Sequence, residues 1–318
     1  MEEQMKNKKN SKKRKRLKRK LASMTAMVLV LTVGMMGTMA YLSTVTTTKN
    51  NTFTGSKGIS LQLTEPQWDA GGDDDANNYT PGKVIAKDPT LTNNTSATGD
   101  TSATEWVAIA VSYHIGDGAA TPDYKPISYT AMNNLIDEID FYDSTAASTA
   151  HTNNNSIPAD EYWIPIYMTT NSGTGAISNV TLTDNSKSDD QAFAIYMYSK
   201  TLAKDASTPA LFNEITVKGT TALEGISGGL AQLKTYVDTN YSGFISSPYN
   251  VNGNLPNFKI DVIGAAVQNE YDDKDHAGTL STSISQLSDA NKNQLIKDLV
   301  EVLEKNIDKD ILKIGGTT

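Results

Sequence analysis

Alternation of apolar and polar residues at every second position is the feature that most limits the fold of this chain. Ile59, Leu61 and Leu63 share one side of the segment GISLQLTE, and polar residues stand between them. The same period recurs in EWVAIAVSYHI (residues 105–115), FAIYMY (193–198) and NFKIDVIGAAVQ (257–268). Strands of this kind suit antiparallel pairing, and two such sheets bury their apolar faces by packing together. We therefore expect a mainly β fold with two packed antiparallel sheets.

Three segments carry apolar residues at helical spacing instead. They are residues 130–142, 228–239 and 288–307. In the last segment Leu295, Leu299 and Leu303 recur every four positions, and Ser288 or Asp289 is suited to cap the start of the helix. Long tracts rich in Ser, Thr, Asn, Asp and Gly separate these elements, and no repeat period is visible. We expect one β-rich domain with helical insertions and an amphipathic C-terminal helix that packs onto it.

The first 40 residues have the pattern of an export signal. The first 20 residues contain 11 Lys or Arg, and residues 21–40 contain no charged residue. The strongly apolar part is short and is followed by small residues, which is typical of a cleaved signal peptide. We expect residues 1–40 to be a signal peptide, cleaved between Ala40 and Tyr41. The alternative is an uncleaved membrane anchor, because a run of 20 uncharged residues is long enough to span a bilayer.

Removal of this signal leaves a strongly acidic chain. Residues 41–318 contain 17 Lys, no Arg and 34 acidic residues, which is a formal net charge of −17. Such a surface repels phosphate backbones, so we expect no nucleic-acid partner. The chain has no Cys, which excludes disulfides, a thiol nucleophile and a Cys-based zinc site. We expect a secreted protein, in the extracellular matrix or at the cell surface, with no membrane attachment after cleavage.

Histidine is too scarce and too scattered to indicate a catalytic centre. The three His residues are His114, His151 and His276. None belongs to an H-E-x-x-H motif and no two are four residues apart, so the common zinc-peptidase motif is absent. We therefore expect a protein that is not an enzyme. His114 is expected to be a strand residue that faces solvent or the edge of a sheet.

Two clusters of Asp in expected loops are the remaining candidates for a ligand site. They are Asp73, Asp74 and Asp75 in GGDDDANN, and Asp272, Asp273 and Asp275 in YDDKDH. Closely spaced carboxylates can bind calcium through hard oxygen ligands. The EF-hand spacing is absent, and a solvated charged loop is the simpler explanation. We predict no cofactor, with calcium at these Asp residues as the alternative.

The segment GTMAYLSTVTTTKNNTFTGSKGISLQL (residues 37–63) joins the expected signal to the first strand. It resembles the junction of exported proteins processed by the SipW type of signal peptidase: Gly-Thr-x-Ala-aromatic, a Thr- and Asn-rich lead-in with a Phe, and an alternating strand. Three later segments are similar to elements that follow in the same family: LTEPQWD (63–69), PGKVIAKDPTLTN (81–93) and EWVAIAVSY (105–113). The family is that of TasA, the camelysins and related biofilm-matrix proteins of Gram-positive bacteria.

This resemblance implies a jelly-roll β-sandwich, residues 55–318, that is exported and assembled into extracellular fibres. It also implies that the mature N-terminal segment, residues 41–54, is a donor strand that completes a sheet in the neighbouring subunit. The apolar residues expected to hold this strand are Tyr41, Leu42, Val45 and Phe53. The expected partners are other copies of the chain, a SipW-type signal peptidase during export, and an accessory matrix subunit. The alternative for residues 41–54 is an unstructured leader.

Two other functions stay open at this point. Camelysin relatives are classed as metallo-endopeptidases, and the resemblance extends that alternative to this chain, although its His residues give little support. The second alternative is a surface adhesin or carbohydrate-binding sandwich. Exposed aromatic platforms would serve such a function, and Trp68, Trp106 and Trp163 are the candidates, although core packing is the commoner role for such residues.

Overall fold

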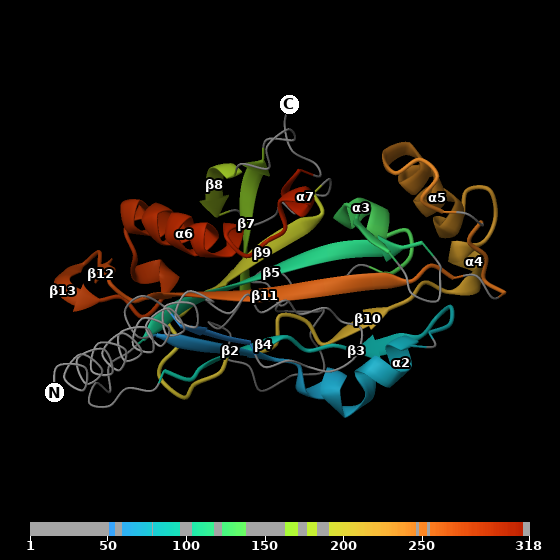
Figure 1. The fold of residues 1–318 in the computed structure, drawn as a ribbon. Helices are drawn as coiled ribbons and strands as arrows, with labels where there is room; N and C mark the ends of the chain where they lie inside the picture. Colours follow the sequence, from blue (N-terminus) through green and yellow to red (C-terminus); the bar gives the residue numbers. More distant parts are fainter. Residues whose placement is uncertain are drawn as a thin grey trace, which may run out of the picture. The chain divides into compact units, whose positions relative to one another are not determined.

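The largest part of the computed structural model is a six-stranded antiparallel sheet (Figure 1). Its strand order is β11–β5–β9–β7–β8, and the short β6 pairs with one end of β5. The bounds are β5 Glu105–Gly116, β6 Tyr124–Pro126, β7 Trp163–Thr170, β8 Ile177–Leu182, β9 Phe193–Tyr198 and β11 Phe258–Gln268. The structure describes residues 51–54, 59–77, 79–95, 104–117, 123–137, 163–170, 177–182, 191–245, 248–252 and 255–313.

A second group of antiparallel strands lies on one side of this sheet (Figure 1). One sheet has the order β1–β2–β4, and a two-stranded sheet pairs β10 with β3. The bounds are β1 Asn51–Thr54, β2 Ser60–Thr64, β3 Val84–Ala86, β4 Thr90–Asn93 and β10 Glu214–Thr216. The chain before β10 also runs along β4, where the Thr208 amide donates to the Leu91 carbonyl at 2.8 Å. The far edge of β4 is therefore covered by its own chain.

The core has two parts, one on each face of β5. Val107, Ile109 and Val111 join Leu61 and the other buried residues of the smaller sheets in one cluster. The alternate residues of β5, beginning with Trp106, pack in a second cluster with the buried residues of α6. Because β5 is covered on both sides, all twelve of its residues are buried. This explains why both of its faces are apolar in the sequence.

Glycine at position 264 allows the sheets to approach closely. A Cβ atom there would lie 2.7 Å from Cδ2 of Leu91 and 3.2 Å from Cδ2 of Leu61. Any side chain at this position would push β11 away from β2 and β4. The β11 strand therefore lies directly over the smaller sheet.

Two of the three expected helices are confirmed. Helix α5 spans Gly229–Asn240, and α6 spans Asp289–Glu304. The Ser288 hydroxyl caps α6 by accepting a bond from the Asn291 amide at 3.3 Å. The buried residues of α6 lie on one stripe of the helix and pack on the large sheet (Figure 1). The prediction of an amphipathic helix that packs onto the domain is therefore correct.

The third helix is much shorter than the sequence indicates. Helix α3 spans Tyr129–Met132, at the start of the expected range of residues 130–142, and residues 138–142 lie outside the described part of the chain. Further along, Ile136 forms a bridge with Val217, and the Asp137 amide donates to the Thr216 carbonyl at 2.8 Å. Strand-like pairing with a distant segment thus outweighs the local helical pattern.

The remaining elements are short. They are the helical turns η1 Trp68–Gly72 and η2 Ile284–Gln286, the helices α2 Asp73–Asn77, α4 Thr220–Leu223 and α7 Lys309–Leu312, and the hairpin of β12 Asp272–Asp273 with β13 His276–Leu280. In the part of the chain that the structure describes, no helix has the length and apolarity needed to cross a bilayer. The prediction of a mainly β fold with antiparallel sheets is confirmed.

Candidate functional site

The residues expected at the cleavage site and in most of the donor strand lie outside the described part of the chain. This applies to Ala40, Tyr41, Leu42 and Val45. Phe53 belongs to β1, whose main chain pairs with β2 of the same molecule, with Phe53 opposite Leu61. The last four residues of the expected donor segment therefore extend the smaller sheet of their own chain. Residues 41–50 lie outside the described residues.

The outer edge of β11 is the main candidate site. In two antiparallel strands, opposite residues alternate between two kinds of pair. In one kind, the two residues exchange main-chain hydrogen bonds. In the other kind, the main-chain N–H and C=O groups of both residues point away from the partner strand. The Gly116 amide donates to the Asn257 carbonyl at 2.7 Å, and the Asn269 amide donates to the Thr104 carbonyl at 3.0 Å. Odd-numbered residues of β11 therefore bond to β5. The main-chain N–H and C=O groups of even-numbered residues point to the outer edge.

In the described part of the chain, this outer edge has no strand partner from residue 262 to residue 268. The outward-facing residues are Val262, Gly264, Ala266 and Gln268. Among the described residues, no strand pairs with β11 on the side away from β5. Val262 and Gly264 are nevertheless buried, and unpaired main-chain groups are costly in such surroundings. The edge thus offers hydrogen bonds to an incoming strand.

Apolar side chains lie on both faces of this edge. Val262 belongs to the core cluster between the sheets. Ile263 and Ala265 belong to the cluster that includes α6. An added strand would therefore find apolar surface above and below it, in addition to main-chain partners.

A buried carboxyl group lies at the end of the same edge. Glu105 is fully buried, and neither of its carboxyl oxygens has a hydrogen-bond partner. Burial raises the pKa of Glu105 to about 8, so the group is mostly protonated at neutral pH. Glu105 stands opposite Gln268 in the ladder. The Gln268 Oε1 atom is also buried without a partner.

The sequence motifs that carry the family resemblance form a structural cluster elsewhere. Glu65 and Lys87 form a fully buried ion pair, with 2.7 Å between Lys87 Nζ and Glu65 Oε1. The same Nζ atom lies 4.6 Å from the centre of the Trp68 ring. Asp88 accepts a bond from the Gln67 amide at 2.8 Å. These contacts join the turn after β2 to the turn after β3, so the motifs have a clear structural role.

His114 is a strand residue, as expected, but the expectation that it faces solvent or the edge of a sheet is wrong. This residue is 8% exposed, and it lies in β5 between neighbouring strands of the large sheet. Its Nδ1 atom lies 3.6 Å from Oδ2 of Asp261, which also pairs with Lys259 at 2.7 Å. Burial and the nearby Lys259 charge lower the pKa of His114 to about 3, so the imidazole is neutral. His151 lies outside the described residues.

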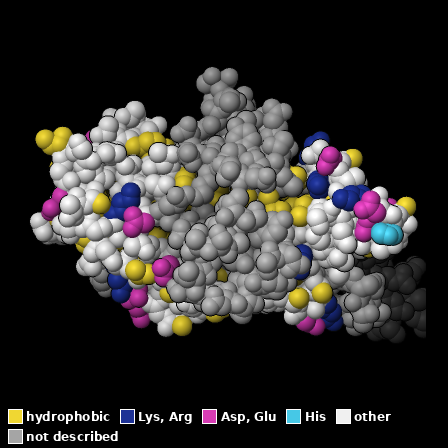
Figure 2. Space-filling model, turned by 180° about the vertical axis from the view of Figure 1, so that it is seen from behind, with side chains coloured by type: hydrophobic (Ala, Val, Ile, Leu, Met, Phe, Trp, Pro, Cys, Tyr) yellow, Lys and Arg dark blue, Asp and Glu magenta, His cyan; other side chains and the backbone are white. Residues whose placement is uncertain are grey.

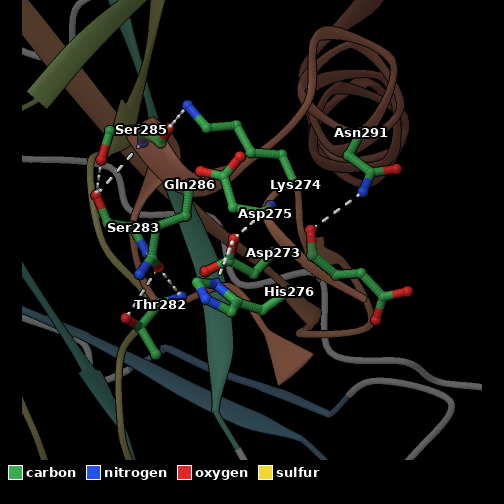
Figure 3. A network of polar contacts seen from close by, with 10 residues as sticks. Asp273, Lys274, Asp275, His276, Thr282, Ser283, Ser285, Gln286 and Asn291 are labelled. Carbon is green, nitrogen blue, oxygen red and sulfur yellow. Dashed lines mark hydrogen bonds and ion pairs between the residues drawn. The ribbon is translucent and has the colours of Figure 1, made fainter. Parts of the chain in front are cut away.

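The two Asp clusters form local contacts. Figure 2 shows a His side chain next to acidic side chains at one end of the molecule. In the hairpin of β12 and β13, Asp273 accepts a bond from the Asp275 amide at 2.8 Å and lies 3.6 Å from His276 (Figure 3). In the other cluster, Asp75 pairs with Lys83 at 2.8 Å. The described residues include no group of three His, Cys, Asp or Glu that could hold a metal ion, and calcium at these Asp residues stays an untested alternative.

The three Trp residues are core residues. Trp68 is 5% exposed, and Trp106 and Trp163 are completely buried. They therefore offer no exposed platform for a carbohydrate. The segment GISGG (residues 225–229) matches the spacing of a nucleophile elbow. However, it lies between α4 and α5, whereas that motif requires a strand before the turn.

Comparisons with known proteins identify no relative of this chain. No family model matches the chain, and neither a curated protein nor a solved structure shows significant similarity to it. The functional argument therefore depends on the residues and contacts described above. The open edge and Glu105 are the features that sequence reasoning missed. A charged residue at the first position of an otherwise apolar strand was the one available signal for Glu105.

Proposed function

We propose that the protein is a secreted structural subunit of extracellular biofilm-matrix fibres. In this proposal residues 55–318 form a jelly-roll-like sandwich, and residues 41–50 of one subunit add a strand to a neighbour. The observation that carries the proposal is the outer edge of β11, along which no strand of the described residues pairs from residue 262 to residue 268. The junction sequence around Ala40 and Tyr41 supports export and exposure of a new N-terminus.

The N-terminal segment has the composition that strand addition requires. Residues 41–50 contain no Pro, which would remove a donor from the ladder, and Lys49 is their one charged residue. Each main-chain bond contributes only about 0.5–1.5 kcal/mol. Tyr41, Leu42 and Val45 would therefore provide much of the binding energy through burial.

A deletion tests the proposal directly. Protein beginning at Asn51 keeps β1 and is expected to fold as a monomer that cannot elongate. Protein beginning at Tyr41 is expected to form fibres under the same conditions. Electron microscopy and light scattering measure fibre growth, and circular dichroism checks folding. Fibres of normal length from the shortened protein would overturn the proposal.

A synthetic peptide of residues 41–50 provides the complementary experiment. It is expected to bind the shortened protein and to cap growing fibres of the longer one. A peptide of the same composition in scrambled order is the control. If the peptide binds no better than its scrambled control, the edge does not accept this segment.

A further inference from the structure

Glu65 and Lys87 bring a carboxyl group and an amino group into contact inside the protein. Lys87 Nζ lies 2.7 Å from Oε1 of Glu65, and only 1% of either side chain is exposed. Among the described residues, neither this Nζ atom nor either Glu65 oxygen takes part in a hydrogen bond. The attraction in a buried ion pair offsets its desolvation only when further hydrogen bonds satisfy its remaining donors and acceptors. As a pair of charges, this contact is therefore costly.

The surroundings of the pair are apolar and tightly packed. The centre of the Trp68 ring lies 4.6 Å from Lys87 Nζ, and Trp68 is itself buried. A Cβ atom at Gly72 would lie 2.2 Å from the carbonyl oxygen of Ala86. The turn after β2 is therefore pressed directly against β3, and the two reactive groups are enclosed between them.

The main chain on both sides of the contact is held in place. The Lys87 amide donates to the Asn213 carbonyl at 3.0 Å. Oδ1 of Asp88 accepts a bond from the Gln67 amide at 2.8 Å, which ties the turn that carries Lys87 to the turn that carries Glu65. Two groups held in this way react as one molecule, with effective concentrations far above those of separate reactants.

We propose that Lys87 and Glu65 condense to form an intramolecular amide cross-link. One proton passes from the Lys87 ammonium group to the Glu65 carboxylate, and the neutral amine then attacks Cδ of Glu65. The bond between Cδ and one carboxyl oxygen breaks, and that oxygen leaves as water with two protons from the Lys87 nitrogen. No electrons are transferred and no co-reactant is needed. The inference does not depend on the proposed function.

The product removes both charges from the interior and closes a loop of the chain. The cross-link joins the end of β2 to the end of β3 and encloses η1 and α2 between them. A covalent link of this kind stabilises a fold by restricting the unfolded chain, as a disulfide does. This chain has no Cys, so an amide between side chains would give it a stabilising link that disulfides cannot provide.

Mass spectrometry of the denatured protein tests the cross-link. The intact mass is expected to be lower than the sequence mass by one water molecule. Trypsin cleaves after Lys and Arg, and it is expected to release residues 58–83 covalently joined to residues 84–125, because the amide blocks cleavage after Lys87. The joined peptides distinguish this bond from loss of water at an Asp or Asn elsewhere. Separate peptides 58–83 and 84–87 would overturn the proposal, whatever the intact mass.

Two variants provide the controls. Lys87→Met combined with Glu65→Leu removes both reacting groups, and replacement of a buried ion pair by apolar side chains is often neutral or stabilising. This variant is expected to fold, as checked by circular dichroism, and to have its full sequence mass. Lys83→Met changes a partly exposed Lys nearby and is expected to keep the loss of water. Loss of water in the first variant, or its absence in Lys83→Met, would assign the reaction to other residues and overturn the proposal.

Discussion

Glu105 illustrates how one residue can depart from the chemistry of its surroundings. It is the first residue of β5, and the six residues after it, Trp106 to Val111, are apolar and buried. Its carboxyl group is kept neutral by burial, because no described cation lies beside it. Lys87, by contrast, is equally buried but has Glu65 as a partner. The difference between the two sites is that Lys87 has an oppositely charged partner among the described residues, whereas burial keeps Glu105 neutral.

The stability of the monomer should therefore depend on pH through Glu105. Its pKa in the folded state is about 8, above the ordinary value of 4.5. Because the pKa is raised in the folded state, the contribution of Glu105 to the free energy of unfolding is fully present below pH 4.5 and is lost as pH rises toward 8. At about 1.4 kcal/mol per pKa unit, the loss is on the order of a few kcal/mol.

Urea unfolding at pH 5 and pH 8, at a dilution that keeps the protein monomeric, checks this prediction. Glu105→Gln should show a much smaller decrease between the two pH values than the unchanged protein. The other carboxylates titrate in both proteins. The difference between the two decreases in the free energy of unfolding therefore measures the contribution of Glu105 alone. Equal decreases would mean that the carboxyl group is solvated in the folded state.

At the scale of the element, β11 combines a complete ladder on one side with an open edge on the other. Its odd-numbered residues are bonded to β5, and the even-numbered residues from 262 to 268 face outward. Natural sheets usually protect such edges with charge, Pro or a covering segment. The segment GAAV at positions 264–267 contains neither a charged residue nor Pro. This is the pattern expected of an edge that binds a partner.

Proline substitutions at neighbouring positions of β11 can separate assembly from folding. Ala266→Pro removes an N–H that faces outward, so the monomer should fold while fibre growth is strongly reduced. Ala265→Pro removes an N–H that bonds to β5 and leaves a buried carbonyl without its donor, so this matched variant should be destabilised by about 1–3 kcal/mol. Circular dichroism and light scattering measure the two effects. Normal fibres from folded Ala266→Pro would exclude this edge as the acceptor.

At the scale of the whole molecule, net charge should control assembly. Residues 41–318 have a formal net charge of −17, so copies repel one another at neutral pH. Among the described side chains visible in Figure 2, Lys and acidic side chains lie next to one another at both ends of the view. The balance between strand addition and repulsion therefore depends on the solution conditions.

Polymerisation is expected to be faster at pH 4 than at pH 8 in low salt. The carboxylates approach their ordinary pKa values near pH 4, and repulsion between copies falls. Added salt at pH 8 should produce part of the same increase by screening. Light scattering measures the rates. Equal rates at both pH values in low salt would contradict this electrostatic account.

The strands and the two longer helices could be predicted from the sequence because their signals are local. Period-two alternation identified β2, β5, β9 and β11, and the four-residue spacing of Leu identified α6. The length of helix α3 was overestimated because Ile136 and Asp137 pair with residues about 80 positions away in the sequence. His114 was misplaced because its exposure depends on which strands lie beside β5.

The sequence by itself determined the period of each strand, the acidity of the chain and the composition of residues 41–50, since these follow from residue order alone. Only the tertiary structure decided which strand lies at the edge of the large sheet, and which buried groups are left without partners. The physical reason is that hydrogen-bond pairing and burial are properties of neighbours in space. The order of strands in a sheet is set by packing between segments far apart in the chain.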